Sequence, residues 1–259
     1  MNANYFCKVV VLILCWLCVK ISFGKTLSDS VYIEDSLLRN ETNPTLFKPT
    51  QLIVPASLIT IGALGLCNDW IKDVNNSIRQ EIGAVRGDNY FHIDDYLQYL
   101  PVASYLGVEY VGAKTKHSIT ERVCVAATSY LTMTIMVNVT KKLVDSPRPD
   151  TGATNSFPSG HTATVFTGAE LMRLEYSTGI GFGAYAVACG VGFLRIWNNR
   201  HWLTDVIAGA GVGILSARIG YWMLPVWQKA FKLKESKTAI SIVPYYYDQS
   251  FGAAMAMVF

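Results

Sequence analysis

The sequence has little charge and no run of like charges. Asp, Glu, Lys and Arg make up 16% of its 259 residues, whereas about 25% is usual in a soluble domain. Hydrophobic residues make up 51% and the mean hydropathy is +0.27, which favours a membrane protein. The formal net charge is only +3, and no Lys/Arg run is interleaved with aromatic residues. A nucleic-acid partner is therefore not expected.

The chain also lacks the patterns of metal sites and of domain linkers. Its six cysteines stand singly or in the N-terminal apolar run, without the paired CxxC motifs of a metal site. We interpret them as small core or lipid-facing residues. No Asp/Glu cluster has metal-binding spacing, and no Ser/Pro/Gly-rich tract or repeat marks a boundary. The sequence therefore predicts one domain without a metal or other cofactor.

The N-terminus has the pattern of a signal peptide. Residues 1–24 combine Lys8, an apolar run and small residues before a cleavage point after Gly24. An uncleaved anchor helix is the alternative, which Lys20 disfavours because a charge is costly in lipid. Residues 25–50 are polar and are predicted to form a loose lead-in.

Six apolar segments predict the helices of the rest of the chain. They cover residues 51–67, 93–112, 119–140, 159–176, 179–196 and 203–224. Most have the roughly 17 to 25 residues needed to cross hydrocarbon, and their many small residues let helix backbones approach closely. We predict an all-α fold, a six-helix transmembrane bundle within residues 51–228.

The segments outside the apolar runs have weaker patterns. Residues 70–92 are amphipathic and are predicted to lie at the membrane interface or to form a helix outside it. The C-terminal tail, residues 229–259, ends in an aromatic-rich stretch from residue 240 that alternates like a strand or hairpin.

Three polar clusters fall at the ends of predicted helices. They are Lys141 with Arg148-Pro149, then Pro158-Ser159-Gly160-His161, and then Arg195 with His201 and Asp205. If the helices alternate in direction, all three clusters lie at one end of the bundle.

Phosphoryl transfer requires residues of these types. A transferring phosphoryl group spreads negative charge over its oxygens, and cations and backbone N–H groups stabilise that charge. Lys141, Arg148 and Arg195 supply cations, and the fork of an arginine matches phosphate oxygens. Ser159 and Gly160 begin a helix whose positive end attracts an anion. The sequence therefore predicts a phosphate-binding site.

The two histidines of the clusters have separate predicted roles. His201 and Asp205 are four residues apart, so on a helix they share one face, and the carboxylate can orient the imidazole. His201 is therefore the predicted nucleophile. His161 is the predicted general acid for the leaving oxygen and the base for the attacking water. Taken singly, each of these residues is more often a structural histidine or a solvated charge.

The three clusters resemble the signature of the type 2 phosphatidic acid phosphatase and vanadium haloperoxidase superfamily, over about residues 95–224. The order and spacing at three places make this pattern specific. The resemblance implies a six-helix core, a phosphohistidine at His201, acid/base action at His161 and support from Asp205. It also implies phosphate contacts from Lys141, Arg148, Ser159, Gly160 and Arg195. The chain departs from many members at Leu194, where they have serine.

Charge placement predicts which side the site faces. Lysines between the second and third helices and after the sixth lie opposite the site, and the positive-inside rule makes them cytoplasmic. The site would then face the periplasm from a bacterial inner membrane. A cleaved signal peptide followed by six spans would place it inside. The weakest segment is 51–67, interrupted by Pro55; if it does not cross, a cleaved signal peptide and an outward-facing site agree.

A membrane lipid phosphate is the expected substrate and the bilayer the expected partner. The resemblance to bacterial membrane-associated lipid phosphatases suggests lipid A first, then phosphatidylglycerol phosphate, undecaprenyl pyrophosphate or phosphatidic acid. The alternatives are a secreted acid phosphatase, a vanadium haloperoxidase and a non-enzyme, namely a transporter or channel whose buried charges line a pathway.

Overall fold

The computed structural model describes residues 44–232, 239–247 and 250–258. The predicted signal peptide and most of the predicted lead-in lie outside these residues. Apart from one C-terminal hairpin, the regular structure of the described chain is helical.

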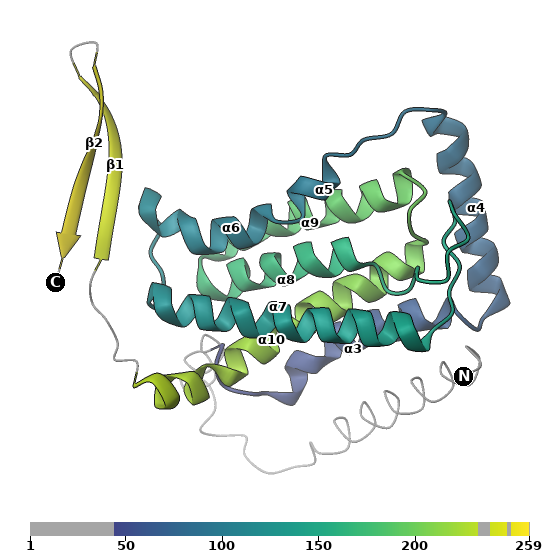
Figure 1. Ribbon diagram of the computed structural model, residues 1–259, viewed down its shortest axis with the longest axis horizontal. Helices are drawn as coiled ribbons and strands as arrows, with labels where there is room; N and C mark the ends of the chain where they lie inside the picture. The colour runs from purple at the N-terminus through teal and green to yellow at the C-terminus, as the bar shows by residue number, and fades with distance from the viewer. Residues whose placement is uncertain (1–43, 233–238, 248–249, 259) are drawn as a thin grey trace, which may run out of the picture.

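A helix forms in each of the six predicted apolar segments (Figure 1). These helices are α3 (Ile53–Leu64), α6 (Leu100–Gly107), α7 (Ile119–Leu143), α8 (Gly160–Glu175), α9 (Thr178–Trp197) and α10 (Leu203–Phe231). Shorter or more polar elements lie between them, namely η1 (Pro49–Leu52), α4 (Asp69–Arg86), α5 (Asp94–Leu97) and η2 (Val108–Val111).

Three described helices, α7, α9 and α10, are long and apolar enough to cross a membrane. A fourth candidate is the pair Pro49–Leu64 and Asp69–Arg86, which bends by 87° at the break between its helices. With 8 and 16 residues, α6 and α8 are shorter than the roughly 20 residues of a simple span. Six separate spans therefore remain a prediction.

The long helix α10 lies at the centre of the bundle and packs against α3, α7 and α8. Its glycines make this packing close. A Cβ at Gly209 would lie 2.6 Å from the backbone oxygen of Ser159, and one at Gly213 would lie 2.5 Å from that of Ala163. Because these separations leave no room for a methyl group, glycine sets the distance between α10 and α8.

The second predicted apolar segment is broken into short pieces rather than one helix. Pro101 occupies the first turn of α6, where its missing N–H costs no hydrogen bond. The preceding helix α5 has a single turn, and its Asp94 side chain is 1% exposed. The break therefore brings a buried carboxylate close to the end of α9.

The polar helix α4 stands across one end of the bundle, at the right of Figure 1, where α7 ends and α8 and α10 begin. Asn68 caps α4 by accepting a hydrogen bond from the N–H of Ile71. The C-terminal hairpin pairs β1 (Ala239–Tyr247) antiparallel with β2 (Ser250–Val258), which confirms the predicted strand or hairpin.

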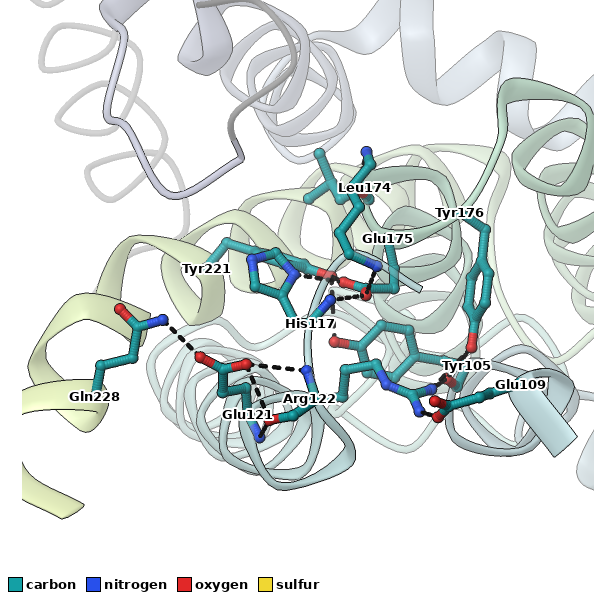
Figure 2. A network of polar contacts seen from close by, with 12 residues as sticks. Tyr105, Glu109, His117, Glu121, Arg122, Leu174, Glu175, Tyr176, Tyr221 and Gln228 are labelled. Atoms are coloured by element: carbon teal, nitrogen blue, oxygen red, sulfur yellow. Dashed lines mark hydrogen bonds and ion pairs between the residues drawn. The ribbon is translucent and has the colours of Figure 1, made fainter. Parts of the chain in front are cut away.

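A buried polar network ties the helices together at the opposite end (Figure 2). The fully buried carboxylate of Glu175, the last residue of α8, accepts hydrogen bonds from the N–H groups of Lys116 and His117 and from the Tyr221 hydroxyl. Arg122 of α7 donates to the carbonyl of Tyr105 at 2.7 Å. Together with the 3.1 Å contact between the Tyr105 and Tyr221 hydroxyls, these bonds join α6, α7, α8 and α10.

One cysteine, Cys67, contradicts the interpretation of all six as simple core or lipid-facing residues. Cys124 and Cys189 are free thiols, whereas Cys67 is disulfide-bonded.

Candidate active site

The predicted clusters meet at the end of the bundle beside α4. A cavity of about 320 Å³ lies there, between α7 and the start of α8. It is lined by Gln98, Met133, Thr134, Val137, Asn138, Lys141, Arg148, Gly160, His161, Thr164 and His201. Five of the eight predicted site residues therefore line one cavity. The other three, Ser159, Arg195 and Asp205, are buried next to it.

Two cations converge on the loop that precedes α8. Lys141, in the last turn of α7, donates to the carbonyl oxygens of Asn155 and, at 3.3 Å, of Ser156. The Nε of Arg148 donates to the Asn155 side-chain oxygen at 2.7 Å. These bonds hold both cations at the cavity wall, where they make it attractive to an anion.

The start of α8 supplies a helix N-terminus to the same cavity. Ser159 is the N-cap, and its fully buried hydroxyl accepts a hydrogen bond from that of Thr162 at 2.9 Å. Its N–H donates to the Asp205 carbonyl at 3.0 Å, which ties α8 to α10. Gly160 lines the cavity, and a Cβ there would have only Val137 nearby, at 3.8 Å. The space beside the Gly160 backbone is therefore open.

His201 lies in the short loop between α9 and α10 and is 3% exposed. Its Nδ1 is 3.5 Å from the Asp205 carboxylate and 3.4 Å from the Ser156 hydroxyl, which itself donates to Asp205. The 3.5 Å separation is long for a hydrogen bond. The orientation of the imidazole therefore depends on Ser156 as well as on Asp205.

Burial determines the protonation of His201. Loss of solvent around the ring, together with the charges of Lys141 and Arg148, lowers the pKa of His201 to about 4, although Asp205 opposes the shift. The imidazole is consequently neutral at pH 7. A neutral ring has the free lone pair that a nucleophile needs.

The loop that carries His201 is held in place by side chains of the surrounding segments. Asn199 adopts a positive φ of 57°, which asparagine tolerates better than most residues. Arg79 of α4 donates to the Asn199 side chain at 3.1 Å, and the indole of Trp202 donates to the Pro147 carbonyl at 2.8 Å. The loop between α7 and α8 and the His201 loop are therefore one connected unit.

On the other side of the cavity, His161 and Arg195 contact the carboxylates of α5. The Nε2 of His161 lies 2.8 Å from Asp95 Oδ1, and the same oxygen lies 3.4 Å from Arg195 Nη1. Arg195 also forms an ion pair with the buried Asp94, which accepts a hydrogen bond from Asn198 at 3.3 Å. His161 and Arg195 therefore each contact a carboxylate of α5.

Several neighbours of the site were not among the predicted residues. They are Asp94, Asp95, Asn155, Ser156 and Asn198. Asn155 and Ser156 lie in the eight-residue stretch between Pro149 and Pro158, so closeness in sequence could have suggested them. Asp95 is 66 residues from His161, and no spacing rule connects the two.

The part of the chain that carries these residues is similar to a known family. Residues 122–229 match the model of a family described as the PAP2 superfamily. Over these residues the chain is similar to the PAP2 superfamily. All eight predicted site residues, from Lys141 to Asp205, lie within residues 122–229.

The chain is similar to two curated proteins. It is 37% identical over 175 residues to "Lipid A 1-phosphatase" of Porphyromonas gingivalis, covering 66% of this chain and 37% of that protein. It is 41% identical over 71 residues to "Bacitracin transport permease protein BcrC" of Bacillus licheniformis, covering 27% of this chain and 34% of that protein. The chain spans about a third of the length of these relatives.

Two crystal structures are also similar to the chain. LpxE of Aquifex aeolicus aligns with a TM-score of 0.43 and 22% identity, over 54% of this chain and 92% of that chain. A transmembrane PAP2-type phosphatidylglycerolphosphate phosphatase of Bacillus subtilis aligns with a TM-score of 0.31 and 16% identity, over 92% of this chain and all of that one. Independently of these, the three candidate spans support an integral membrane protein.

Proposed function

We propose that this chain is a metal-independent phosphatase that removes phosphate from a membrane lipid through a phosphohistidine on His201. The observation that carries the proposal is that Lys141, Arg148, His161 and His201 line the same cavity. It combines a buried neutral histidine, a second histidine and two fixed cations, which are the groups that phosphoryl transfer through a covalent intermediate requires.

In the first step, His201 attacks the phosphorus of the bound ester. Its Nδ1 faces Ser156 and Asp205, so Nε2 is the nitrogen that forms the N–P bond. The bond from phosphorus to the leaving oxygen breaks, and His161 gives that oxygen a proton. Lys141 and Arg148 stabilise the charge on the phosphoryl oxygens.

In the second step, water releases the phosphate. His161, now neutral, takes a proton from the water as its oxygen attacks phosphorus, and the N–P bond to His201 breaks. The imidazole of His201 is then neutral again, and inorganic phosphate leaves. Asp205 and Ser156 stabilise the positive charge that His201 carries while it is phosphorylated.

The shape of the cavity supports an amphiphilic substrate. Its α7 wall runs from Lys141 back to Asn138, Val137, Thr134 and Met133, a distance of about 12 Å at 1.5 Å per residue. One end is therefore cationic, and the other follows a helix that is apolar enough to cross a membrane. A phosphate headgroup at the first end would place its lipid chains along the second.

We propose an envelope lipid as the substrate, with lipid A first because the Porphyromonas gingivalis relative is named a lipid A 1-phosphatase. Phosphatidylglycerol phosphate, undecaprenyl pyrophosphate and phosphatidic acid are the other candidates. The proposal includes the bacterial inner membrane, a periplasmic site and a six-helix transmembrane arrangement, with the phosphatase domain at residues 51–228.

The test is phosphate release by the detergent-purified protein from these four lipids, without added metal and with EDTA. We compare the wild type with His201→Ala and with His92→Ala, a matched control because His92 is exposed and lies outside the cavity. We expect EDTA-resistant release from one preferred lipid, lost by at least about a hundredfold in His201→Ala and kept in His92→Ala. Release that survives His201→Ala would contradict the phosphohistidine.

A further inference from the structure

Each histidine of the proposed site has a carboxylate partner, but the two carboxylates differ in origin. Asp205 lies four residues after His201, at the start of α10. Asp95 lies 66 residues before His161 and reaches it from the one-turn helix α5. It also lies outside residues 122–229, the part that matches the PAP2 model. The second carboxylate is therefore supplied from outside the matched domain.

The two neighbouring carboxylates of α5 have different surroundings. Asp94 is 1% exposed, and both of its oxygens are occupied, by Arg195 and by Asn198. Asp95 is 50% exposed, and its Oδ1 lies 2.8 Å from His161 and 3.4 Å from Arg195. Asp94 thus fixes Arg195 in the fold, whereas Asp95 contacts the histidine at the cavity.

We propose that Asp95 is the positioning residue of His161, holding its Nε2 so that Nδ1 serves the reacting oxygens. The inference rests on the proposed function and adds to it a residue that recognises no substrate itself. When His161 carries two protons, the Asp95 carboxylate accepts the Nε2–H and stabilises the imidazolium. The Nδ1 proton then passes to the leaving oxygen as its bond to phosphorus breaks.

The contact between Asp95 and His161 also positions His161 to take a proton from water in the second step. After the leaving group departs, His161 is neutral, with Nε2–H still donated to Asp95 and the lone pair on Nδ1. That lone pair accepts the proton of the attacking water, which restores the imidazolium. Asp95 therefore fixes the tautomer in both steps, and its own charge does not change.

The charges around His161 determine how strongly Asp95 acts. The nearest are Asp94 and Asp95 of α5 and Arg195 of α9. The cavity is also lined by three other charged or titratable residues, namely Lys141 of α7 and, from the loops, Arg148 and His201. Burial of the ring and the charge of Arg195 disfavour the imidazolium of His161, whereas Asp95 and Asp94 favour it. Removal of the Asp95 charge would consequently leave little to favour the imidazolium.

A histidine titration tests the contact without relying on catalysis. The sequence has four histidines, so NMR of ¹³C-histidine-labelled protein in detergent should resolve His161, assigned with His161→Ala. We expect Asp95→Asn to lower the pKa of His161 by about one unit and Asp95→Glu to restore part of the shift. Asp88→Asn, a matched control at an exposed carboxylate before α5, should leave it unchanged.

Kinetics then test the role in the reaction. We expect Asp95→Asn to reduce kcat/KM about tenfold at pH 7 and to move the basic limb of the pH profile down by about one unit. In a His161→Ala background, Asp95→Asn should have no further effect, because its action passes through His161. Asp95→Ser is a second variant if Asp95→Asn is not recovered folded.

The two possible failures are distinguishable. An active wild type whose His161 titration and basic limb are unchanged by Asp95→Asn overturns the positioning role, as do multiplicative effects of Asp95→Asn and His161→Ala. If Asp95→Asn shifts the His161 titration as expected but the wild type releases no phosphate from any lipid, the proposed function is overturned.

Discussion

At the scale of single residues, His201 combines burial with an incomplete contact to its carboxylate. Its side chain is almost fully enclosed, and its Nδ1 is 3.5 Å from Asp205. Enclosure disfavours the imidazolium more than Asp205 favours it, so the pKa of His201 falls to about 4. The same residue is therefore ready to act as a nucleophile over most of the acidic range.

A pH profile of hydrolysis checks this state. Protonation removes the lone pair of His201, and a lowered pKa means that protonation begins only at low pH. We expect the acid limb of kcat/KM to have its midpoint near pH 4. Protonation of His201 should therefore not reduce activity between pH 5 and 7. A midpoint near 6.5, the value of an unperturbed histidine, would contradict the effect of burial.

At the scale of elements, the contact between α8 and α10 sets the geometry of the site. The start of α8 carries Ser159, whose N–H binds the Asp205 carbonyl in α10 at 3.0 Å. One turn later, Gly209 faces the Ser159 carbonyl with no room for a side chain. The predicted role of small residues, close approach of helices, is therefore fulfilled where the two catalytic segments meet.

Gly209→Ala tests this packing. The added Cβ would lie 2.6 Å from the Ser159 oxygen, so α8 and α10 must separate, at a cost of about 1–3 kcal/mol. We expect a lower Tm in detergent and a reduced kcat. Gly190→Ala in α9 is the matched control, because nothing lies within 4 Å of its added Cβ. Equal stability of the two variants would rule out the close contact.

At the scale of the whole molecule, the two ends of the bundle have different tasks. The catalytic end is held by loops and by α5, whereas the opposite end is closed by the network around Glu175 (Figure 2). The helix α8 joins them, with His161 near its start and Glu175 at its end. At 1.5 Å per residue these two lie about 21 Å apart.

Glu175→Gln tests whether the distant network serves stability alone. The carboxylate accepts hydrogen bonds from two backbone N–H groups, His117 and Tyr221, and an amide cannot satisfy all of them. We expect a loss of about 1–3 kcal/mol, seen as a lower Tm, with kcat/KM of the folded protein unchanged. Glu81→Gln, at an exposed residue of α4, is the control. A large fall in kcat/KM at low temperature would show that the two ends are coupled.

The sequence by itself determined the helices and the members of the three clusters. Apolar runs of the right length located α7, α9 and α10 to within a few residues, except that α10 continues to Phe231, because hydrophobicity along one segment is a local property. The spacing predicted that His201 and Asp205 share one face of a helix; their side chains are 3.5 Å apart, but His201 lies in the loop before α10 rather than on the helix. The second segment, with Pro101 inside it, was predicted as one helix and is instead broken.

Only the tertiary structure decided which groups complete the site. Ser156 reaches His201 because the loop before α8 folds against the start of α10, and Asp95 reaches His161 because the break before α6 turns α5 toward the cavity. Contacts between segments 45 and 66 residues apart depend on how helices pack. Packing follows from the shapes of many side chains together, and no local pattern in the chain records it.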